Sequence, residues 1–337
     1  MNDARPMRHA LALGRRGLGN TWPNPAVGCV LVRDGRVVGR GWTQPGGRPH
    51  AEVMALAQAG AAACGATAYV TLEPCAHHGK TPPCAEALVR AGVARVVSAL
   101  TDPDPRVAGR GHAILRAAGI AVTEGVCAAE AREAQRGFLT RITAGRPMLT
   151  LKLAGSFDGR IATASGESQW ITGAQARRHV HALRLSHDAV MVGGETARAD
   201  RPGLNVRGFG PVRQPVRIVV SGRALPDLPA EGPDHGPLWQ VSGEPAGFMA
   251  ELGARGLTRV FCEGGGVLAA SLLRAGLVDQ LIGHTAGLVL GGDGRAGVAA
   301  LGLQRLADAP RFRLVETRRL GGDILHRWLR AEDDGGA

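Results

Sequence analysis

The apolar residues in the first part of the chain occur in short runs separated by turn-forming residues. Residues 29–32 and 37–39 flank an Asp34-Gly35 turn, which predicts a β-hairpin. Strands are also expected at 68–72, 93–100 and 120–123, and helices at 7–16, 85–90, 111–118 and from His50 onward. Strands that alternate with helices in this way predict an α/β sandwich.

The second part of the chain shows a similar alternation. Strands are expected at 148–154, 189–192, 216–220 and 260–262, a turn at 156–160, and helices at 175–185 and 267–274. Glycines 264–266 separate the last of these strands from its helix. A strand, glycines and a helix can admit a phosphate to the backbone, although glycine runs also form plain turns. No Gly-x-Gly-x-x-Gly motif follows a first strand, so a standard dinucleotide-binding fold is not indicated.

Length and composition favour a protein of two domains. A chain of 337 residues is long enough for two domains of ordinary size. Apolar residues make up 45% of the chain and aromatic residues only 4%, so the cores must consist mainly of Ala, Val and Leu. We expect one domain at residues 1–145 and a second at 146–337, joined near residues 141–147.

The sequence gives no sign of export or membrane insertion. Residues 1–6 lack the basic-then-apolar layout of a signal peptide, and no run of about 18 apolar residues occurs. The six cysteines are therefore interpreted as thiols and metal ligands rather than as a disulfide framework. We expect a cytoplasmic protein with no membrane partner.

The net charge of +11 first suggests a nucleic-acid partner. The positive residues are spread along the chain, however, and Tyr69 is the only tyrosine, so the aromatic set of an RNA-binding surface is missing. A phosphorylated small substrate and an anionic cofactor would favour the same positive field. We therefore expect no nucleic-acid partner.

Lysine is rare among the basic residues. The chain contains two lysines, Lys80 and Lys152, and all its other permanently charged basic residues are arginines. A lysine that persists in such a chain can mark a position that needs a compact ammonium group. Biased codon usage with two chance survivors is the alternative; we favour a functional role for Lys152 and leave Lys80 open.

Three residues in two segments predict a zinc site. His50, Cys75 and Cys84 offer one nitrogen and two thiolates, and three protein ligands leave the fourth tetrahedral position for water. Glu52 lies two residues after His50, where it could move protons without binding the metal. This arrangement is typical of zinc deaminases that act on nucleobases. A structural zinc with His77 or His78 as fourth ligand, or simple packing of the cysteines, remains the alternative.

Longer motifs around these residues resemble a known family. Five segments resemble the deaminase half of the bifunctional riboflavin-biosynthesis deaminase–reductases. They are Asn24-Pro25-x-Val27-Gly28, His50-Ala51-Glu52, residues 71–75, residues 77–84 and the Asp102–Gly111 segment. Eight residues separate Cys75 from Cys84. Cytidine and tRNA deaminases usually keep two residues there, so the longer loop argues against those enzymes.

The resemblance implies a role for each residue of the first half. It implies an N-terminal cytidine-deaminase-like α/β/α sandwich in which His50, Cys75 and Cys84 bind zinc and Glu52 is the general acid and base. Asn24 resembles the position that contacts the pyrimidine. An Asn-Pro turn before a strand is the alternative for Asn24.

The segments from Met148 onward are similar to the reductase half of the same family, whose α/β fold resembles dihydrofolate reductase and which uses NADPH. The resemblance as a whole covers roughly residues 5 to 330. The resemblance implies NADPH contacts at Ala154, Trp170, Thr196, Asp200, Ser221, Gly265, Gly266, Val267, Leu268, Ala269, Ala270 and Ser271. It implies substrate contacts at Ser168, Arg184, Leu204, Arg207 and Glu263, with the arginines facing a phosphate. Lys152, as a catalytic residue, and Asp200 are the polar groups expected near hydride transfer. Without the resemblance, Arg184 could be a solvated helix residue and Trp170 a core residue.

Two positions depart from the family pattern. Ser221-Gly222-Arg223 follows a predicted strand where an acidic residue and a longer turn are more common, which weakens the expected NADPH contact at Ser221. Gly287 stands where proline is usual, and this change is expected to affect only a turn.

The resemblance implies two consecutive reactions. The first is zinc-dependent hydrolytic deamination of 2,5-diamino-6-(5-phosphoribosylamino)pyrimidin-4(3H)-one to 5-amino-6-(5-phosphoribosylamino)uracil. The second is reduction of the ribosyl group by NADPH to give 5-amino-6-(5-phosphoribitylamino)uracil. The resemblance also implies a homo-oligomer. A nucleic-acid-editing zinc deaminase with an auxiliary domain, and a zinc-stabilised binding protein without enzymatic activity, are the rival hypotheses.

Overall fold

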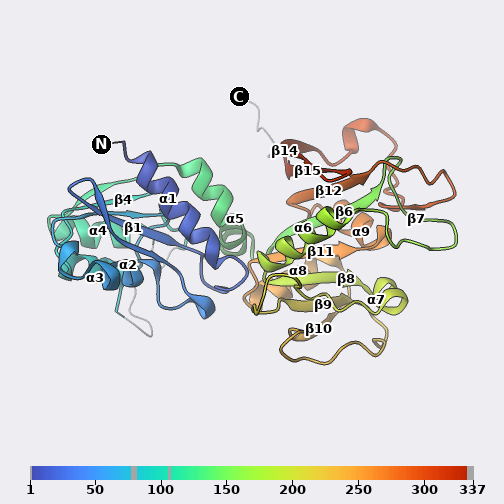
Figure 1. The fold of residues 1–337 in the computed structure, drawn as a ribbon, viewed down its shortest axis with the longest axis horizontal. Coiled ribbons are helices and arrows are strands. Elements are labelled where there is room, and N and C mark those ends of the chain that lie inside the picture. The colour runs from blue at the N-terminus through green and yellow to red at the C-terminus, as the bar shows by residue number, and fades with distance from the viewer. Residues whose placement is uncertain (1, 77–81, 105–107, 332–337) are drawn as a thin grey trace. The chain divides into compact units, whose positions relative to one another are not determined.

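The computed structural model describes residues 2–76, 82–104 and 108–331. The chain divides into two compact units, Met1–Gly145 and Arg146–Ala337, which are described separately (Figure 1). Within the described residues, no helix is both long and apolar enough to cross a membrane.

Unit 1 is built on a five-stranded mixed sheet with the order β2-β1-β3-β4-β5. β1 pairs antiparallel with β2 and β3, while β3, β4 and β5 are parallel. The strands are β1 (Gly28–Arg33), β2 (Arg36–Trp42), β3 (Thr67–Val70), β4 (Arg95–Ser98) and β5 (Ala121–Thr123). The helices are α1 (Ala4–Gly14), α2 (Ala51–Ala59), α3 (Cys84–Arg90), α4 (Arg110–Ala117) and α5 (Ala128–Ala144).

Two glycines show that α1 and α2 cover opposite faces of this sheet. A Cβ atom on Gly28 would lie 1.9 Å from the Ala10 carbonyl oxygen of α1, and one on Gly41 would lie 2.1 Å from the Ala51 carbonyl oxygen of α2. Gly41 pairs with Cys29, the neighbour of Gly28, so the two glycines face opposite sides of the pleat. The resulting α/β/α layers confirm the predicted sandwich.

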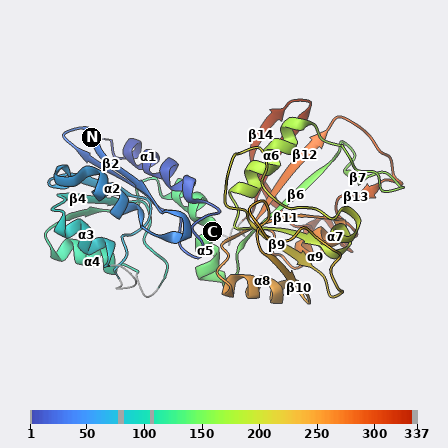
Figure 2. The same ribbon diagram turned by 60° about the horizontal axis from the view of Figure 1, so that its bottom comes forward.

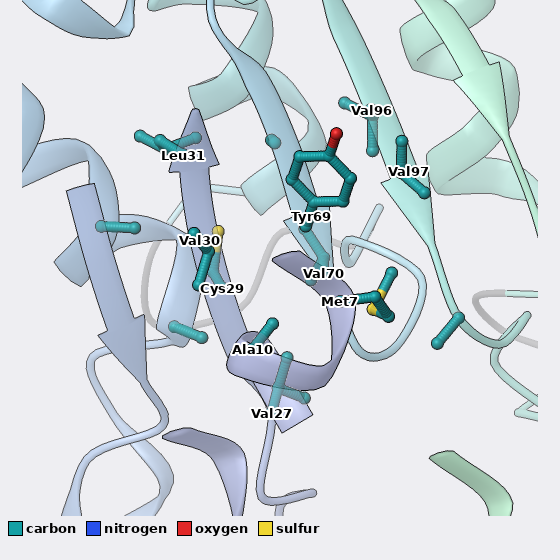
Figure 3. Close-up of a cluster of buried hydrophobic side chains, with 14 of the residues drawn as sticks. Met7, Ala10, Val27, Cys29, Val30, Leu31, Tyr69, Val70, Val96 and Val97 are labelled. Carbon is teal, nitrogen blue, oxygen red and sulfur yellow. The ribbon is translucent and has the colours of Figure 1, made fainter. Parts of the chain in front are cut away.

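The core of unit 1 lies between α1 and the central strands. Figure 3 shows Met7 of α1 beside side chains of β1, β3 and β4, among them Val30, Tyr69 and Val97, and each of these four is at most 1% exposed. Because aromatic residues are scarce, aliphatic side chains from three strands supply most of the buried area. This core fixes the ends of the strands and helices from which the polar residues project.

Unit 2 contains an eight-stranded sheet with the order β10-β9-β8-β11-β6-β12-β15-β14. The strands from β10 to β12 are parallel, and β15 and β14 add antiparallel strands at one edge. The strands of this sheet are β6 (Met148–Ser156), β8 (Ala189–Gly193), β9 (Val216–Val220), β10 (Leu238–Val241), β11 (Arg259–Gly264), β12 (Gln280–Ala286), β14 (Phe312–Leu320) and β15 (Asp323–Arg330). A separate short pair joins β7 (Arg160–Ala162) to β13 (Arg295–Ala296).

Helices cover both faces of the unit 2 sheet (Figure 2). α6 lies on the face that carries Glu263 and His284, to which its side chains bond. α9 lies on the other face, where Leu268 packs against Gly264. The helices are α6 (Ala174–Leu185), α7 (Gly194–Asp200), α8 (Pro245–Ala254) and α9 (Gly266–Arg274).

Most of the elements expected from apolar patterning are confirmed, with ends that shift by a few residues. The boundary between the two units, after Gly145, lies within the expected junction at 141–147, of which residues 141–144 belong to α5. The patterning gave no expectation for α5, α7, α8, β10, β12, β14 or β15. At Gly287 a Cβ atom would meet nothing within 4 Å, which is consistent with the view that this departure affects only a turn.

Candidate functional site

His50, Cys75 and Cys84 come together in unit 1 from three different positions. His50 is the N-cap residue of α2, Cys84 is the first residue of α3, and Cys75 lies on the loop after β3. Their ligand atoms lie within 4.8 Å of one another. Two helix starts and one strand-end loop therefore converge at this cluster.

The distances among these atoms fit a zinc ion. His50 Nδ1 lies 3.3 Å from Cys84 Sγ and 3.7 Å from Cys75 Sγ. Tetrahedral zinc with ordinary Zn–N and Zn–S bonds would separate a nitrogen from a sulfur by about 3.5 Å. Within the described part of the chain the cluster has three members. His77, His78 and Lys80 lie outside the described residues, so the structural-zinc alternative stays open.

The protein groups alone already favour a thiolate in this cluster. Hydrogen bonds from Cys84 and from His50 lower the pKa of Cys75 to about 4. The pKa of Cys84 is raised, first because its proton is shared with Cys75 and then because the thiol is buried. The backbone N–H of Cys84 also donates to Cys75 Sγ at 3.3 Å. A bound cation would favour loss of the second proton as well.

Glu52 is placed for proton transfer beside the cluster. It lies in the first turn of α2 and is 3% exposed. Burial raises its pKa to about 7, and it interacts with the Cys84 thiol. A carboxyl group that titrates near neutral pH can both accept and return a proton, as a general acid and base must.

A buried carboxylate that the sequence reasoning missed supports the Cys75 loop. Glu73 accepts backbone N–H groups of Asp102 and Gly109 on Oε2, and of Gly111 and His112 on Oε1, at 2.8–3.4 Å. Gly111 packs so closely that a Cβ atom would lie 1.9 Å from the Pro74 carbonyl oxygen. Glu73 thus joins the segment before Cys75 to the start of α4.

Asn24 lies in a turn, as its alternative reading predicted. Its N–H donates to the Thr21 carbonyl oxygen at 3.0 Å, and its side-chain amide lies over Gly47, where a Cβ atom would be only 2.0 Å from Nδ2. Gly47 has a φ of +82°, which suits glycine. The pyrimidine contact of Asn24 stays a prediction.

A second polar cluster lies in unit 2, where Lys152 of β6, Arg184 of α6 and Glu263 of β11 meet. Arg184 donates to both carboxylate oxygens of Glu263, at 2.5 and 3.0 Å, and Lys152 Nζ lies 3.8 Å from Glu263 Oε2. Burial raises the pKa of Glu263, but the charges of Arg184 and Lys152 outweigh it and leave that pKa below its usual range. The Arg184 side chain is only 12% exposed, so the solvated-residue alternative is wrong.

Two histidines beside this cluster were not singled out from the sequence. His179 Nδ1 on α6 lies 3.0 Å from His284 Nε2 on β12, and His284 is 1% exposed. Burial, with the charges of His179 and Lys152, lowers the pKa of His284 to about 3, which keeps its ring neutral. His284 pairs in register with Ala154, and its Nδ1 has no hydrogen-bond partner among the described residues. The sequence feature that could have indicated His284 is a histidine within a mainly apolar run, residues 280–286.

Two of the predicted NADPH contacts, Thr196 and Gly265, meet where β8 and β11 end. Thr196 of α7 lies against Gly265, where a Cβ atom would be 3.0 Å from Thr196 Oγ1. Gly265 has a φ of +79° and precedes α9. Later in α9, Leu268, Ala269 and Ala270 are buried in the core, whereas Val267 is 77% exposed. Residues 265–267 are therefore the most accessible part of this predicted contact.

The other predicted contacts lie in varied surroundings. Trp170 is 66% exposed and has the Arg177 guanidinium 4.5 Å from its ring, so the core alternative for Trp170 is wrong. Leu204 is buried, with a φ of +50°. Ala154 and Ser271 are half-buried, whereas Ser168, Asp200 and Arg207 are exposed.

Ser221 is buried, and its hydroxyl group stabilises a turn. The hydroxyl donates to the Arg223 carbonyl oxygen at 3.0 Å and accepts the Arg223 N–H at 3.2 Å. Arg198 Nη1 also donates to it, at 3.5 Å. A hydroxyl group can donate one hydrogen bond and accept two, so these three hydrogen bonds leave it unable to form another.

Comparison with known proteins gives consistent matches across both units. Residues 147–326 match the family model described as the RibD C-terminal domain, and residues 1–100 match that of the cytidine and deoxycytidylate deaminase zinc-binding region. The riboflavin biosynthesis protein RibD of Escherichia coli is 45% identical, with 96% of this chain and 98% of that protein covered.

Solved structures agree with these matches. Acinetobacter baumannii RibD has a TM-score of 0.89 and 41% identity, covering 98% of this chain and 99% of that one. A diaminohydroxyphosphoribosylaminopyrimidine deaminase/5-amino-6-(5-phosphoribosylamino)uracil reductase of Thermotoga maritima has a TM-score of 0.86 and 32% identity, with the same coverage. The similarity thus extends over both units.

Proposed function

The chain belongs to the RibD family of bifunctional riboflavin-biosynthesis enzymes, and we propose which of its residues perform the two reactions. As a member it is a zinc-dependent deaminase and an NADPH-dependent reductase. We assign deamination to residues 1–145 and reduction to residues 146–337. The observation that carries the proposal is the cluster of His50, Cys75 and Cys84 beside buried Glu52.

The first reaction converts 2,5-diamino-6-(5-phosphoribosylamino)pyrimidin-4(3H)-one and water into 5-amino-6-(5-phosphoribosylamino)uracil and ammonia. His50, Cys75 and Cys84 would hold zinc, which when bound supplies Lewis-acid activation of water. Asn24 would contact the pyrimidine ring from the turn before β1.

Glu52 would perform the proton transfers of this reaction. Its carboxylate would accept the proton that water loses on attack and pass it to the ring nitrogen. It would then move the proton of the newly formed hydroxyl group to the departing amine, which leaves as ammonia. Because burial holds its pKa near 7, both protonation states are accessible at neutral pH. Burial also keeps bulk water from competing for the proton.

The second reaction takes up one hydride and one proton, opens the ribosyl ring and leaves a ribityl chain. NADPH when bound supplies the hydride to the first carbon of the sugar. Lys152 would give the proton to the ring oxygen as the ring opens, because its ammonium lies in the cluster with Glu263 and Arg184. Asp200 lies at the end of α7 and is exposed, so its part in this step stays a prediction.

Arg207 is our candidate for the substrate phosphate. Arg184 already donates to Glu263 and to the Asn205 carbonyl oxygen, whereas the Arg207 side chain is exposed. The Arg207 backbone N–H bonds to His181 Nδ1 at 3.2 Å, which positions it next to α6. Arg184 would then order Glu263 and Lys152, while Ser168 and Leu204 complete the predicted substrate contacts.

Of the rival functions, a nucleic-acid-editing deaminase is not favoured, because the matches cover the reductase unit as well as the deaminase unit. Absence of a salt-sensitive tRNA gel shift would agree with this. The homo-oligomer, the lack of a nucleic-acid partner and the cytoplasmic location stay predictions.

A paired assay tests the proposal. Zinc-loaded protein is mixed with the diaminopyrimidinone ribosylamine phosphate and NADPH, and ammonia and NADPH are followed together. We expect ammonia to appear first and NADPH then to fall. Glu52→Gln should retain zinc but release no ammonia. Deamination by that variant at the unmodified rate would refute the role of Glu52, and ammonia release without NADPH loss would refute the reductase assignment.

A further inference from the structure

Two arginines meet where neighbouring strands of unit 2 end. β8 and β9 pair in parallel up to Gly193 and Val220, and Arg198 and Arg223 lie on the segments that follow them. Arg198 Nη2 lies 2.8 Å from Glu195 Oε1, and Arg223 Nη1 lies 3.8 Å from the same oxygen. One carboxylate therefore serves two guanidinium groups, and the cluster keeps a net positive charge.

Arg198 is the more buried of the two and is incompletely bonded. Its side chain is 30% exposed, and its Nη1 donates to buried Ser221 Oγ. Its Nε is buried and has no hydrogen-bond partner within the part of the chain that the structure describes. Nε and Nη2 form one edge of the guanidinium, and Glu195 bonds only to Nη2 of that edge. A tetrahedral oxyanion could accept from both nitrogens in the bidentate mode that arginine favours.

The turn that carries Arg223 is fixed in place. Gln240 Nε2 on β10 donates to the carbonyl oxygens of Ser221 and Arg223, at 2.8 and 2.9 Å. The Ser221 hydroxyl bonds to both the N–H and the carbonyl oxygen of Arg223. Because that hydroxyl has no capacity left, Ser221 orients the arginines rather than contacting a ligand itself. The Arg223 side chain is 81% exposed and accessible from solvent.

The position of this pair suits the distal end of NADPH. In the order β9-β8-β11-β6, three strand spacings separate β9 from β6, which carries Lys152. At roughly 4.8 Å per spacing, this is about 14 Å along the edge of the sheet. Gly265 and Thr196 lie between these ends, at β11 and β8, where a pyrophosphate would lie. An extended dinucleotide with its nicotinamide near Lys152 would thus bring its adenosine end to Arg198 and Arg223.

From these contacts we propose that Arg198 and Arg223 bind the 2′-phosphate of NADPH and make the reductase select NADPH over NADH. The inference rests on the proposed function of unit 2. The phosphate displaces Glu195, accepts from Nε and Nη2 of Arg198, and pairs with the guanidinium of Arg223. NADH lacks this group and leaves the Arg198 Nε without a partner.

Two readouts on the full-length, zinc-loaded enzyme test this inference. The first is the ratio of kcat/KM with NADPH to kcat/KM with NADH, using the deaminated intermediate as substrate. The second is the ratio of the Kd of NAD⁺ to that of NADP⁺, which needs no turnover. Arg198→Ala should lower both ratios by about tenfold to a hundredfold, as for loss of charge-assisted hydrogen bonds. Arg223→Ala should lower them by only about threefold, because this exposed charge is screened by water.

Further variants separate the proposal from a general charge effect. Arg198→Lys keeps the charge but loses the bidentate edge, and should give ratios between those of the unmodified enzyme and Arg198→Ala. Glu195→Gln removes the competing carboxylate and should raise both ratios. Arg313→Ala removes one exposed positive charge on β14 and is the matched control, with ratios like those of the unmodified enzyme.

The proposal would be overturned if Arg198→Ala weakened binding and turnover of both cofactors equally. It would also be overturned if Arg198→Ala and Arg313→Ala lowered the two ratios by the same factor. Its failure differs from failure of the proposed function. If the unmodified protein binds NADP⁺ but oxidises no NADPH, the reductase assignment fails, while the Kd ratio still decides whether Arg198 recognises the 2′-phosphate.

Discussion

The polar clusters of the two units are assembled in different ways. In unit 1, His50 and Cys84 lie at the starts of two helices, and Cys75 lies on the loop after β3. In unit 2, Lys152 and Glu263 come from adjacent strands that are more than a hundred residues apart in sequence, and Arg184 comes from a helix between them in the chain. The first cluster depends on short motifs and the second on the order of strands in a sheet.

This difference explains what could be predicted from the sequence. The spacing of His50, Glu52, Cys75 and Cys84 predicts a set of zinc ligands before any fold is known, because histidine and cysteine are typical ligands of zinc. Lysine, arginine and glutamate occur in many kinds of site, so these residue types alone do not indicate a particular reaction. Only the pairing of β11 with β6 brings Glu263 to Lys152, and the sequence could link them only through resemblance to a family.

Substitutions in the two clusters test this comparison. Removal of a zinc ligand should have the largest effect on activity. Cys75→Ser removes the thiolate with the lowered pKa, so zinc binding should fail and ammonia release should fall by about a thousandfold or more, since a metal supplies several kcal/mol to such a step. Zinc content and ammonia release measure this. Reduction of supplied intermediate should continue; its loss in the same variant would contradict the separation of the two sites.

Loss of Glu263 should affect unit 2 next most strongly. Glu263→Gln leaves Lys152 and Arg184 close together without their carboxylate, and breaking such a buried pair costs about 3–5 kcal/mol. Denaturant unfolding of the full chain, together with NADPH oxidation, measures this loss. Glu316→Gln on β14 breaks half-exposed pairs and should cost about 1 kcal/mol or less. Equal losses in the two variants would refute the importance of the buried cluster.

The support that Glu73 gives to the Cys75 loop should have an intermediate effect. Glu73→Gln replaces one carboxylate oxygen by an amide NH2 group, which cannot accept hydrogen bonds from the backbone N–H groups that this oxygen accepts in the unmodified protein. Groups that orient metal ligands typically change metal affinity by about tenfold to a hundredfold, and we expect a loss in that range. Competition with a zinc chelator measures it, with Glu130→Gln at a half-exposed position of α5 as the control. Unchanged affinity would limit Glu73 to a role in folding.

The last effect, which is the smallest for a change of one pH unit, concerns the dependence of stability on pH. His187 is fully buried, accepts from Thr150 or donates to it at 3.0 Å, and bonds to the Leu183 carbonyl oxygen at 2.7 Å. Burial lowers its pKa from about 6.5 to about 3, so the folded protein keeps it neutral while the unfolded chain binds a proton. Its contribution to stability is thus complete above pH 6.5 and is lost as the pH falls toward 3.

A variant can isolate this contribution. The linkage amounts to at most about 1.4 kcal/mol per pH unit between those values. His187→Gln should reduce the slope of unfolding free energy against pH by up to that amount between pH 6 and 4. Urea unfolding at several pH values measures the slope, and an unchanged slope would show that His187 is not the group responsible.

The fold shows the same division between local and distant information. The β1–β2 hairpin and α6 follow from apolar periodicity and turn residues in short windows, and both were predicted nearly to their ends. α7 was not, because Gly194–Asp200 has few apolar residues, and α5 was missed in a segment rich in charge. Long-range pairing also decides the edge of unit 2, where β14 is exposed along much of its length and lacks a buried pattern.

The sites show this division at single residues. Glu73 and His284 were missed because a lone carboxylate or histidine has many ordinary roles, and only tertiary contacts give each its partners. Leu204 and Ala269 were named through resemblance, but a sequence cannot tell whether such a residue offers its side chain or its backbone. Both side chains are buried, and the Ala269 N–H already donates to the Gly265 carbonyl oxygen, so their contacts stay predictions.

The central claim is that two separate clusters in one chain perform consecutive reactions, and half-reactions of two variants test it most directly. Glu52→Gln and Lys152→Met would each be assayed for ammonia release from the diaminopyrimidinone substrate and for NADPH oxidation with supplied deaminated intermediate. We expect Glu52→Gln to lose only ammonia release and Lys152→Met to lose only NADPH oxidation. Loss of both half-reactions in either correctly folded variant would contradict the claim.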